Sequence, residues 1–194
     1  MTALDRALPL ARSARLTDAH TAVLLMCVFG GGWALVEEGN YAEGYTRITI
    51  GQEIWRDAGG VLFVPRDNMI RASGLIGLKR FDEAKGLLDE AIQTIEQTGH
   101  RMDEAEVHRV RGDLQRQEDA KLAEASYLKA LGVARYQDAR GLELRAAVSL
   151  ARLWQGQGKR EAGRELLAPI YNWFTEGLQT RDLRNAKALL IELS

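Results

Sequence analysis

Apolar positions along the chain recur with a period of about 40 residues, which is typical of a helical repeat protein. The period is set by four anchor positions, each near the start of the second helix of an expected helix pair: Glu43, Glu83, Leu122 and Ala162. Beyond each anchor, at the same offset, stands a large apolar side chain: Ile48, Leu88, Tyr127 and Leu167. A helix that packs one face on its neighbours requires such positions.

Small residues recur with the same period in the first helix of each expected pair. They lie at a nearly constant offset before the anchors: Gly32, Ala72, Gly112 and Ala151. A small side chain allows two helices to approach closely, so we expect each to face the second helix of its own pair. The alternative is chance recurrence of Ala and Leu in a generic helical bundle. The chain has 3 prolines and no convincing alternating strand pattern, so we expect close to no strand.

The periodicity predicts an all-α fold, a right-handed α-solenoid of antiparallel helix pairs, as one domain over residues 1–194. The expected parts are a half repeat at 2–15, repeats at 17–57, 61–98, 102–137 and 141–176, and a C-terminal capping helix at 181–193. The half repeat lacks its first helix. We therefore expect an open N-terminal end and a closed C-terminal end.

Two stretches of sequence carry a resemblance to known families. The pattern Gly-x-Tyr-x-Glu at 39–43, with Ala130-Leu131 in a later second helix, resembles tetratricopeptide repeats, although the period exceeds their usual length of about 34 residues. The segments 141–154, 158–160, 166–171, 173–177 and 182–190 are similar to the C-terminal repeat region of large bacterial signalling proteins. Those proteins join a class III adenylate or guanylate cyclase domain to a signal-transducing ATPase domain.

The family resemblance implies an accessory module and no enzymatic activity. The catalytic and nucleotide-binding domains of the family would lie N-terminal to this region, and neither is recognisable in the chain. The resemblance becomes looser before Ala84, where Gly30 to Gly32, Ile50 and Asn68 are unusual choices. We expect either a shortened product or a piece of such a signalling protein.

Charge and composition change this picture little. The formal net charge is -1 with acidic and basic residues mixed, so neither nucleic acid nor an anionic membrane is an expected partner. The apolar stretch 21–36 is interrupted by three glycines and is too short to span a bilayer. A single cysteine, Cys27, favours a reducing compartment, and we expect a cytoplasmic protein.

No pattern of residues indicates catalysis. The glycines at 30–32 are not followed by the Lys-Ser/Thr of a phosphate-binding loop, and close helix packing is their simpler interpretation. His20, His100 and His108 are too scattered for a metal site. Cys27 has no adjacent basic residue that would stabilise a thiolate. We therefore expect no enzyme activity, no cofactor and no metal.

A partner-binding groove is the expected functional feature. In tetratricopeptide-like stacks the first helices line a concave groove, at positions fixed relative to the small residue. The candidates form an apolar end and a basic end: Met26, Phe29, Trp33 and Met69, then Arg109, Arg116, Arg145 and Arg152. Such a groove would accept an amphipathic or acidic protein segment. Alternatively, the apolar residues pack on a missing repeat or belong to the core.

The sequence therefore favours a non-catalytic protein-protein interaction or regulatory scaffold of a cyclase/ATPase signalling system. Its partner would be a protein or peptide, with self-association through the N-terminal end as a further possibility. Two alternatives stay open: part of a nucleotide cyclase or NTPase whose catalytic domains are absent from this chain, and a structural fragment with no role of its own.

Overall fold

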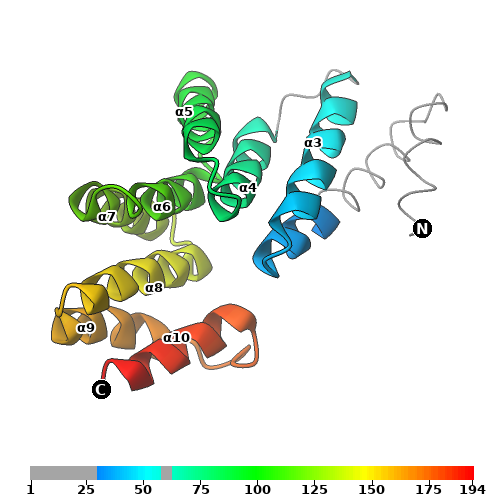
Figure 1. The fold of residues 1–194 in the computed structure, drawn as a ribbon. Helices are drawn as coiled ribbons and strands as arrows, with labels where there is room; N and C mark the ends of the chain where they lie inside the picture. The colour runs from blue at the N-terminus through cyan, green and yellow to red at the C-terminus, as the bar shows by residue number, and fades with distance from the viewer. Residues whose placement is uncertain (1–29, 58–62) are drawn as a thin grey trace. The chain divides into compact units, whose positions relative to one another are not determined.

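A computed structural model describes residues 30–57 and 63–194 of the chain, and these residues are in helices and short connections (Figure 1). A helical stretch at 30–37 precedes a series of longer helices. Their bounds are α3 Tyr41–Asp57, α4 Val64–Gly77, α5 Phe81–Thr98, α6 Glu104–Gln115, α7 Ala120–Tyr136, α8 Arg140–Gly156, α9 Arg160–Asn172 and α10 Arg181–Glu192. No strand occurs in the described ranges, which confirms the all-α prediction there. The predicted half repeat at 2–15 lies outside them.

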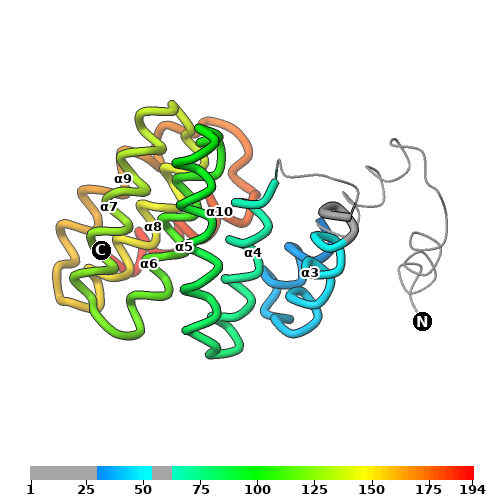
Figure 2. Tube along the Cα trace, turned by 90° about the horizontal axis from the view of Figure 1, so that it is seen from above, coloured from blue at the N-terminus to red at the C-terminus, as the bar shows by residue number. Residues whose placement is uncertain are grey.

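The chain divides into two compact units, with the boundary between Gln97 and Thr98. In the first unit α3 packs on α4. In the second unit each helix from α6 to α10 packs on the next one, and α8 also contacts both α6 and α10 (Figure 1, Figure 2). The helices α6, α8 and α10 therefore form a connected row within the second unit.

The large apolar residues that the period predicted are all in the core. They are at most 1% exposed: Ile48, Leu88, Tyr127 and Leu167. The predicted small residues are buried as well: Gly32, Ala72, Gly112 and Ala151. A Cβ atom built on Gly112 would lie 2.4 Å from Cε1 of the Tyr127 ring, and one built on Gly32 would lie 2.5 Å from Cγ1 of Ile48. The prediction of close packing is therefore confirmed at Gly32 and Gly112.

The structure shows a second row of small residues directly after the anchor positions. Its members are all buried: Gly44, Ala84, Ala123 and Gly163. A Cβ atom on Gly163 would lie 3.3 Å from the carbonyl oxygen of Ala151, and one on Gly44 would lie 2.9 Å from that of Gly32. Small residues on both facing helices therefore bring the backbones together.

The connections between helices carry the same period in their backbone angles. Positive φ occurs at Gly39 (86°), Lys79 (60°) and Gly158 (78°), and in another set of turns at Gly99 (70°), Asp138 (51°) and Gly177 (66°). Lys79 follows Gly39 by one period, and successive members of the second set are also one period apart. The left-handed region favours glycine, so Lys79 occupies a strained position that glycine fills one period earlier.

The contact between Gly112 and the Tyr127 ring provides the first prediction. We expect Gly112→Ala to lower the free energy of unfolding by about 1–3 kcal/mol, because the ring must move to admit a methyl group. Gly132→Ala is the matched control, since Gly132 lies within α7 with nothing within 4 Å of its added Cβ. That substitution should stabilise the protein by about 0.5–1 kcal/mol. Chemical denaturation measures both, and equal effects would contradict the packing.

The strained turn at Lys79 provides the second prediction. We expect Lys79→Gly to raise the free energy of unfolding by about 0.5–1 kcal/mol, because relief of left-handed strain outweighs the added flexibility of the unfolded chain. Lys85→Gly, at an exposed position inside α5, removes the same side chain and should destabilise the protein by about 1 kcal/mol. Thermal unfolding curves of the two variants should shift in opposite directions.

Candidate partner-binding face

Charged side chains from α6, α8 and α10 meet on the row that these helices form. The centre is Glu106 of α6, which is 6% exposed. Its Oε1 accepts a hydrogen bond from Nη2 of Arg109 at 2.8 Å and lies 3.1 Å from Nη2 of Arg145 in α8. One carboxylate thus joins arginines from two helices that are not consecutive in the chain.

The network continues from both arginines. Nη1 of Arg109 donates to Oδ2 of Asp113 at 2.6 Å, and Oδ1 of Asp113 accepts from the Tyr127 hydroxyl at 2.7 Å. On the other side, Nε of Arg145 lies 3.9 Å from Oδ2 of Asp182 in the first turn of α10. We call these residues the ionic cluster: Glu106, Arg109, Asp113, Tyr127, Arg145 and Asp182. It connects α6, α7, α8 and α10.

The pKa values in the cluster follow from burial and charge together. Burial by itself would raise the pKa of Glu106, but the positive charges of Arg109 and Arg145 outweigh it, so this pKa lies below its ordinary value. Burial and the neighbouring Asp113 carboxylate raise the pKa of the Tyr127 hydroxyl far above its ordinary value. Glu106 is therefore charged and Tyr127 protonated near neutral pH.

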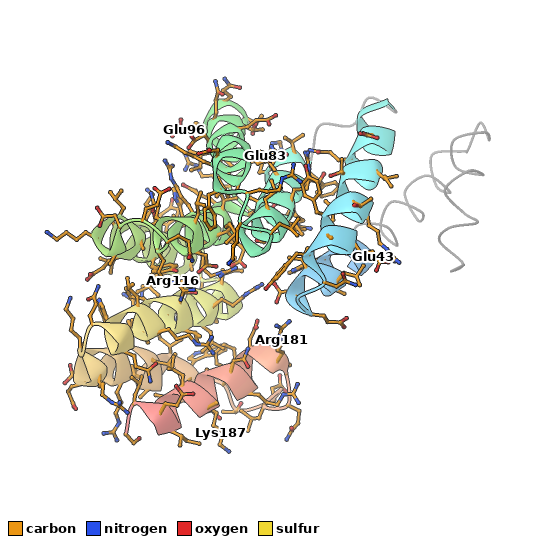
Figure 3. The ribbon with its side chains drawn as sticks, viewed as in Figure 1. Glu43, Glu83, Glu96, Arg116, Arg181 and Lys187 are labelled. Atoms are coloured by element: carbon orange, nitrogen blue, oxygen red, sulfur yellow. The ribbon has the colours of Figure 1, made fainter. Side chains whose placement is uncertain are left out.

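The structure brings two of the predicted groove residues together and leaves two others exposed. Arg109 and Arg145 meet at Glu106, so their charges are largely neutralised inside the protein. Arg116, which is labelled in Figure 3 and directly follows α6, is exposed, and so is Arg152 in α8. Their side chains make no ion pair with a described residue. Arg116 and Arg152 are therefore the predicted arginines with charge available to a partner.

The predicted apolar end of the groove lies in the first unit or outside the described residues. Trp33 is 39% exposed, and its Nε1 donates to Oε1 of Glu37 at 3.4 Å. Met69 is 6% exposed and offers little area to a partner. Met26 and Phe29 lie outside the described residues.

The sequence pattern did not indicate the roles of Tyr127 and Asp182 in the ionic cluster. Tyr127 was predicted only as a core residue, and its ring is in the core while its hydroxyl joins the cluster. A polar atom on an otherwise apolar core position was the available signal, because buried hydroxyl groups need a hydrogen-bond partner. Nothing in the sequence pattern linked Asp182 with Arg145.

A separate polar group is buried in the first unit. Nε2 of Gln52 donates to Oδ1 of Asn68 at 3.0 Å, and Oε1 of Gln52 accepts from Nη1 of Arg71. Gln52 and Asn68 are 3% and 1% exposed. These bonds connect α3 to α4 and account for the unusual Asn68, whose amide fixes how the two helices pack.

Comparison of the chain with known proteins gave no match, either to a protein-family model or to a curated protein. Across residues 30–57 and 63–194, no three His, Cys, Asp or Glu side chains are grouped as a metal site would require. No helix among the same residues has the length and apolar character needed to cross a membrane.

The pairing of Glu106 provides the third prediction. We expect Glu106→Gln to lower the free energy of unfolding by about 3 kcal/mol near neutral pH, because Arg109 and Arg145 lose their shared counter-charge. Glu83→Gln, in an exposed pair with Arg80, is the control and should leave stability nearly unchanged. Urea denaturation of both variants measures the difference.

The lowered pKa of Glu106 also sets the direction of its pH dependence. The contribution of ionised Glu106 to the free energy of unfolding is complete above the pKa of a glutamate in the unfolded chain, about 4.3. It is lost as the pH falls through the lower pKa of Glu106 in the folded protein. The stability difference between wild type and Glu106→Gln should therefore shrink on acidification below about pH 4.3. A difference that stayed constant down to strongly acidic pH would contradict a charged Glu106.

Proposed function

We propose that this protein is a non-catalytic protein-interaction module built as a right-handed α-solenoid of antiparallel, tetratricopeptide-like helix pairs. The observation that supports this most is the repeat period, which appears in the buried small positions and again in the positive-φ turns. Contacts between α6 and α8, and between α8 and α10, are those expected when each pair stacks on the next. A stack of this kind exposes an extended face on which a partner segment can bind.

In this proposal the binding face lies along α6, α8 and α10. The ionic cluster holds these helices in register, because the Glu106 carboxylate pairs with both Arg109 and Arg145. Arg116 and Arg152 remain exposed and can form charge-assisted hydrogen bonds with carboxylates of a bound segment. The partner is therefore a protein segment that carries Asp or Glu together with apolar residues.

The wider setting is proposed from the resemblance described above. The module would serve a cytoplasmic cyclase/ATPase signalling system as a scaffold or regulatory part. The apolar candidates Trp33 and Met69 would also bind a protein segment, on the first unit. Trp33 is the more exposed of the two.

The exposed arginines provide the fourth prediction. We expect the wild-type protein to bind a subset of the peptides on an array whose members combine acidic and apolar residues. The double variant Arg116→Glu with Arg152→Glu should bind that subset about tenfold or more weakly, because attraction becomes repulsion. The matched control is Lys129→Glu with Arg164→Glu, which makes the same charge change at exposed positions of α7 and α9.

Equal weakening by the two double variants would mean that only net charge matters, and the proposed face would be wrong. Turnover of ATP or GTP by the purified chain, abolished by a point substitution, would contradict the non-catalytic assignment.

A further inference from the structure

Large exposed side chains gather at the connections between successive helix pairs of the second unit. Met102 lies just before α6, Tyr136 ends α7, and Trp173 directly follows α9. They are 62%, 91% and 58% exposed. Exposed apolar residues are common singly, but a group of this kind marks a candidate contact surface.

Hydrogen bonds and ring contacts place these connections next to one another. Nε2 of Gln137 donates to the carbonyl oxygen of Arg101 at 2.7 Å, which joins the turn before α6 to the end of α7. The Arg140 guanidinium lies 5.5 Å from the centre of the Trp173 ring, which joins the start of α8 to the end of α9. We call this surface the turn edge: Arg101, Met102, Arg135, Tyr136, Arg140 and Trp173.

Two buried carboxylates hold the arginines of the turn edge. Glu143 is 4% exposed and accepts from Nε of Arg135 at 2.8 Å and from Nη1 of Arg140 at 3.0 Å. Glu104 is 7% exposed and accepts from Nη1 of Arg101 at 3.0 Å. The pairs Arg101–Glu104 and Arg140–Glu143 lie one period apart, so the same arrangement occurs in successive repeats.

The accessible part of these ion pairs is the guanidinium. Arg101 and Arg135 side chains are 54% and 53% exposed, whereas the carboxylates beneath them are buried. Arg135 uses only Nε toward Glu143, and its two Nη groups make no hydrogen bond to another described residue. A guanidinium held from one side presents its remaining donors in a fixed direction, which suits a carboxylate. Asp138 carries an exposed carboxylate on the same surface, and its Oδ1 lies 3.0 Å from Nη2 of Arg140.

We propose that the turn edge is a second protein-binding surface, which takes an acidic segment of a partner protein whose apolar side chains contact Met102, Tyr136 and Trp173. Tyr, Trp, Met and Arg are the residue types enriched at protein interfaces, and each is present here. The oriented donors of Arg101 and Arg135 select carboxylates, so the segment is acidic and not basic. The turn edge shares no residue with the ionic cluster or with Arg116 and Arg152, and it does not require the face along α6, α8 and α10 to function.

The test is selection from a phage-displayed library of random peptides on three forms of the full chain. These are wild type, the edge variant Arg135→Lys with Tyr136→Ser, and the control Leu122→Ser. Arg135→Lys keeps the positive charge beside Glu143 but removes the planar guanidinium with its several donors. Tyr136 is 91% exposed, so its replacement should not disturb the fold. Leu122 is 52% exposed at the other end of α7, so its loss removes similar apolar area away from the turn edge.

We expect wild type and the control to enrich sequences that combine Asp or Glu with apolar residues. Fluorescence anisotropy with the enriched peptides should show about tenfold or weaker binding to the edge variant. Their binding to Arg116→Glu with Arg152→Glu should stay within about twofold of wild type, which separates this surface from the binding face.

Three results would overturn the proposal. Enriched peptides that bind the edge variant as tightly as wild type would place the site elsewhere. Enrichment of basic or uncharged sequences would contradict the role of the arginines. Binding of phosphatidylserine vesicles by wild type but not by the edge variant, without enrichment of peptides, would assign the surface to a membrane instead of a protein.

Discussion

Close approach between helices at small residues is the constraint on which the rest of this structure depends. The contact of Gly32 with Ile48, that of Gly112 with Tyr127, and that of Ala151 with Gly163 occur at related positions of the repeat period. A larger residue at any of these points would push two helices apart, and a packed interior cannot absorb the displacement locally.

Charge is organised around that packing and does not replace it. Glu106 is buried, and the arginines that it binds are largely covered, with side chains 13% and 17% exposed. Loss of either partner would leave a charge without its counter-charge, so these ion pairs favour one arrangement of the helices. The cluster joins α6, α8 and α10 by side chains that reach between helices. Tyr127 links the two kinds of interaction, because its ring packs on Gly112 while its hydroxyl binds Asp113.

The same period produces two different surfaces on the second unit. Side chains along α6 and α8 form the proposed binding face, with exposed Arg116 and Arg152. The connections between helices form the turn edge, where buried glutamates hold exposed arginines beside aromatic rings. At the turn edge a carboxylate neutralises part of the arginine charge and orients what remains, whereas Arg116 and Arg152 make no ion pair with a described residue.

The sequence by itself determined the helical class, the period and the buried positions of the core. Ile48, Leu88, Tyr127 and Leu167 were predictable because helix packing repeats at fixed intervals and demands apolar side chains there. Only the tertiary structure decided which charges meet. Arg109 and Arg145 were predicted as free donors for a partner, yet each is already paired with Glu106, since side-chain rotamers and the spacing between helices select the ion pairs. The grouping of Met102, Tyr136 and Trp173 was equally invisible in sequence, because it depends on how successive connections pack side by side.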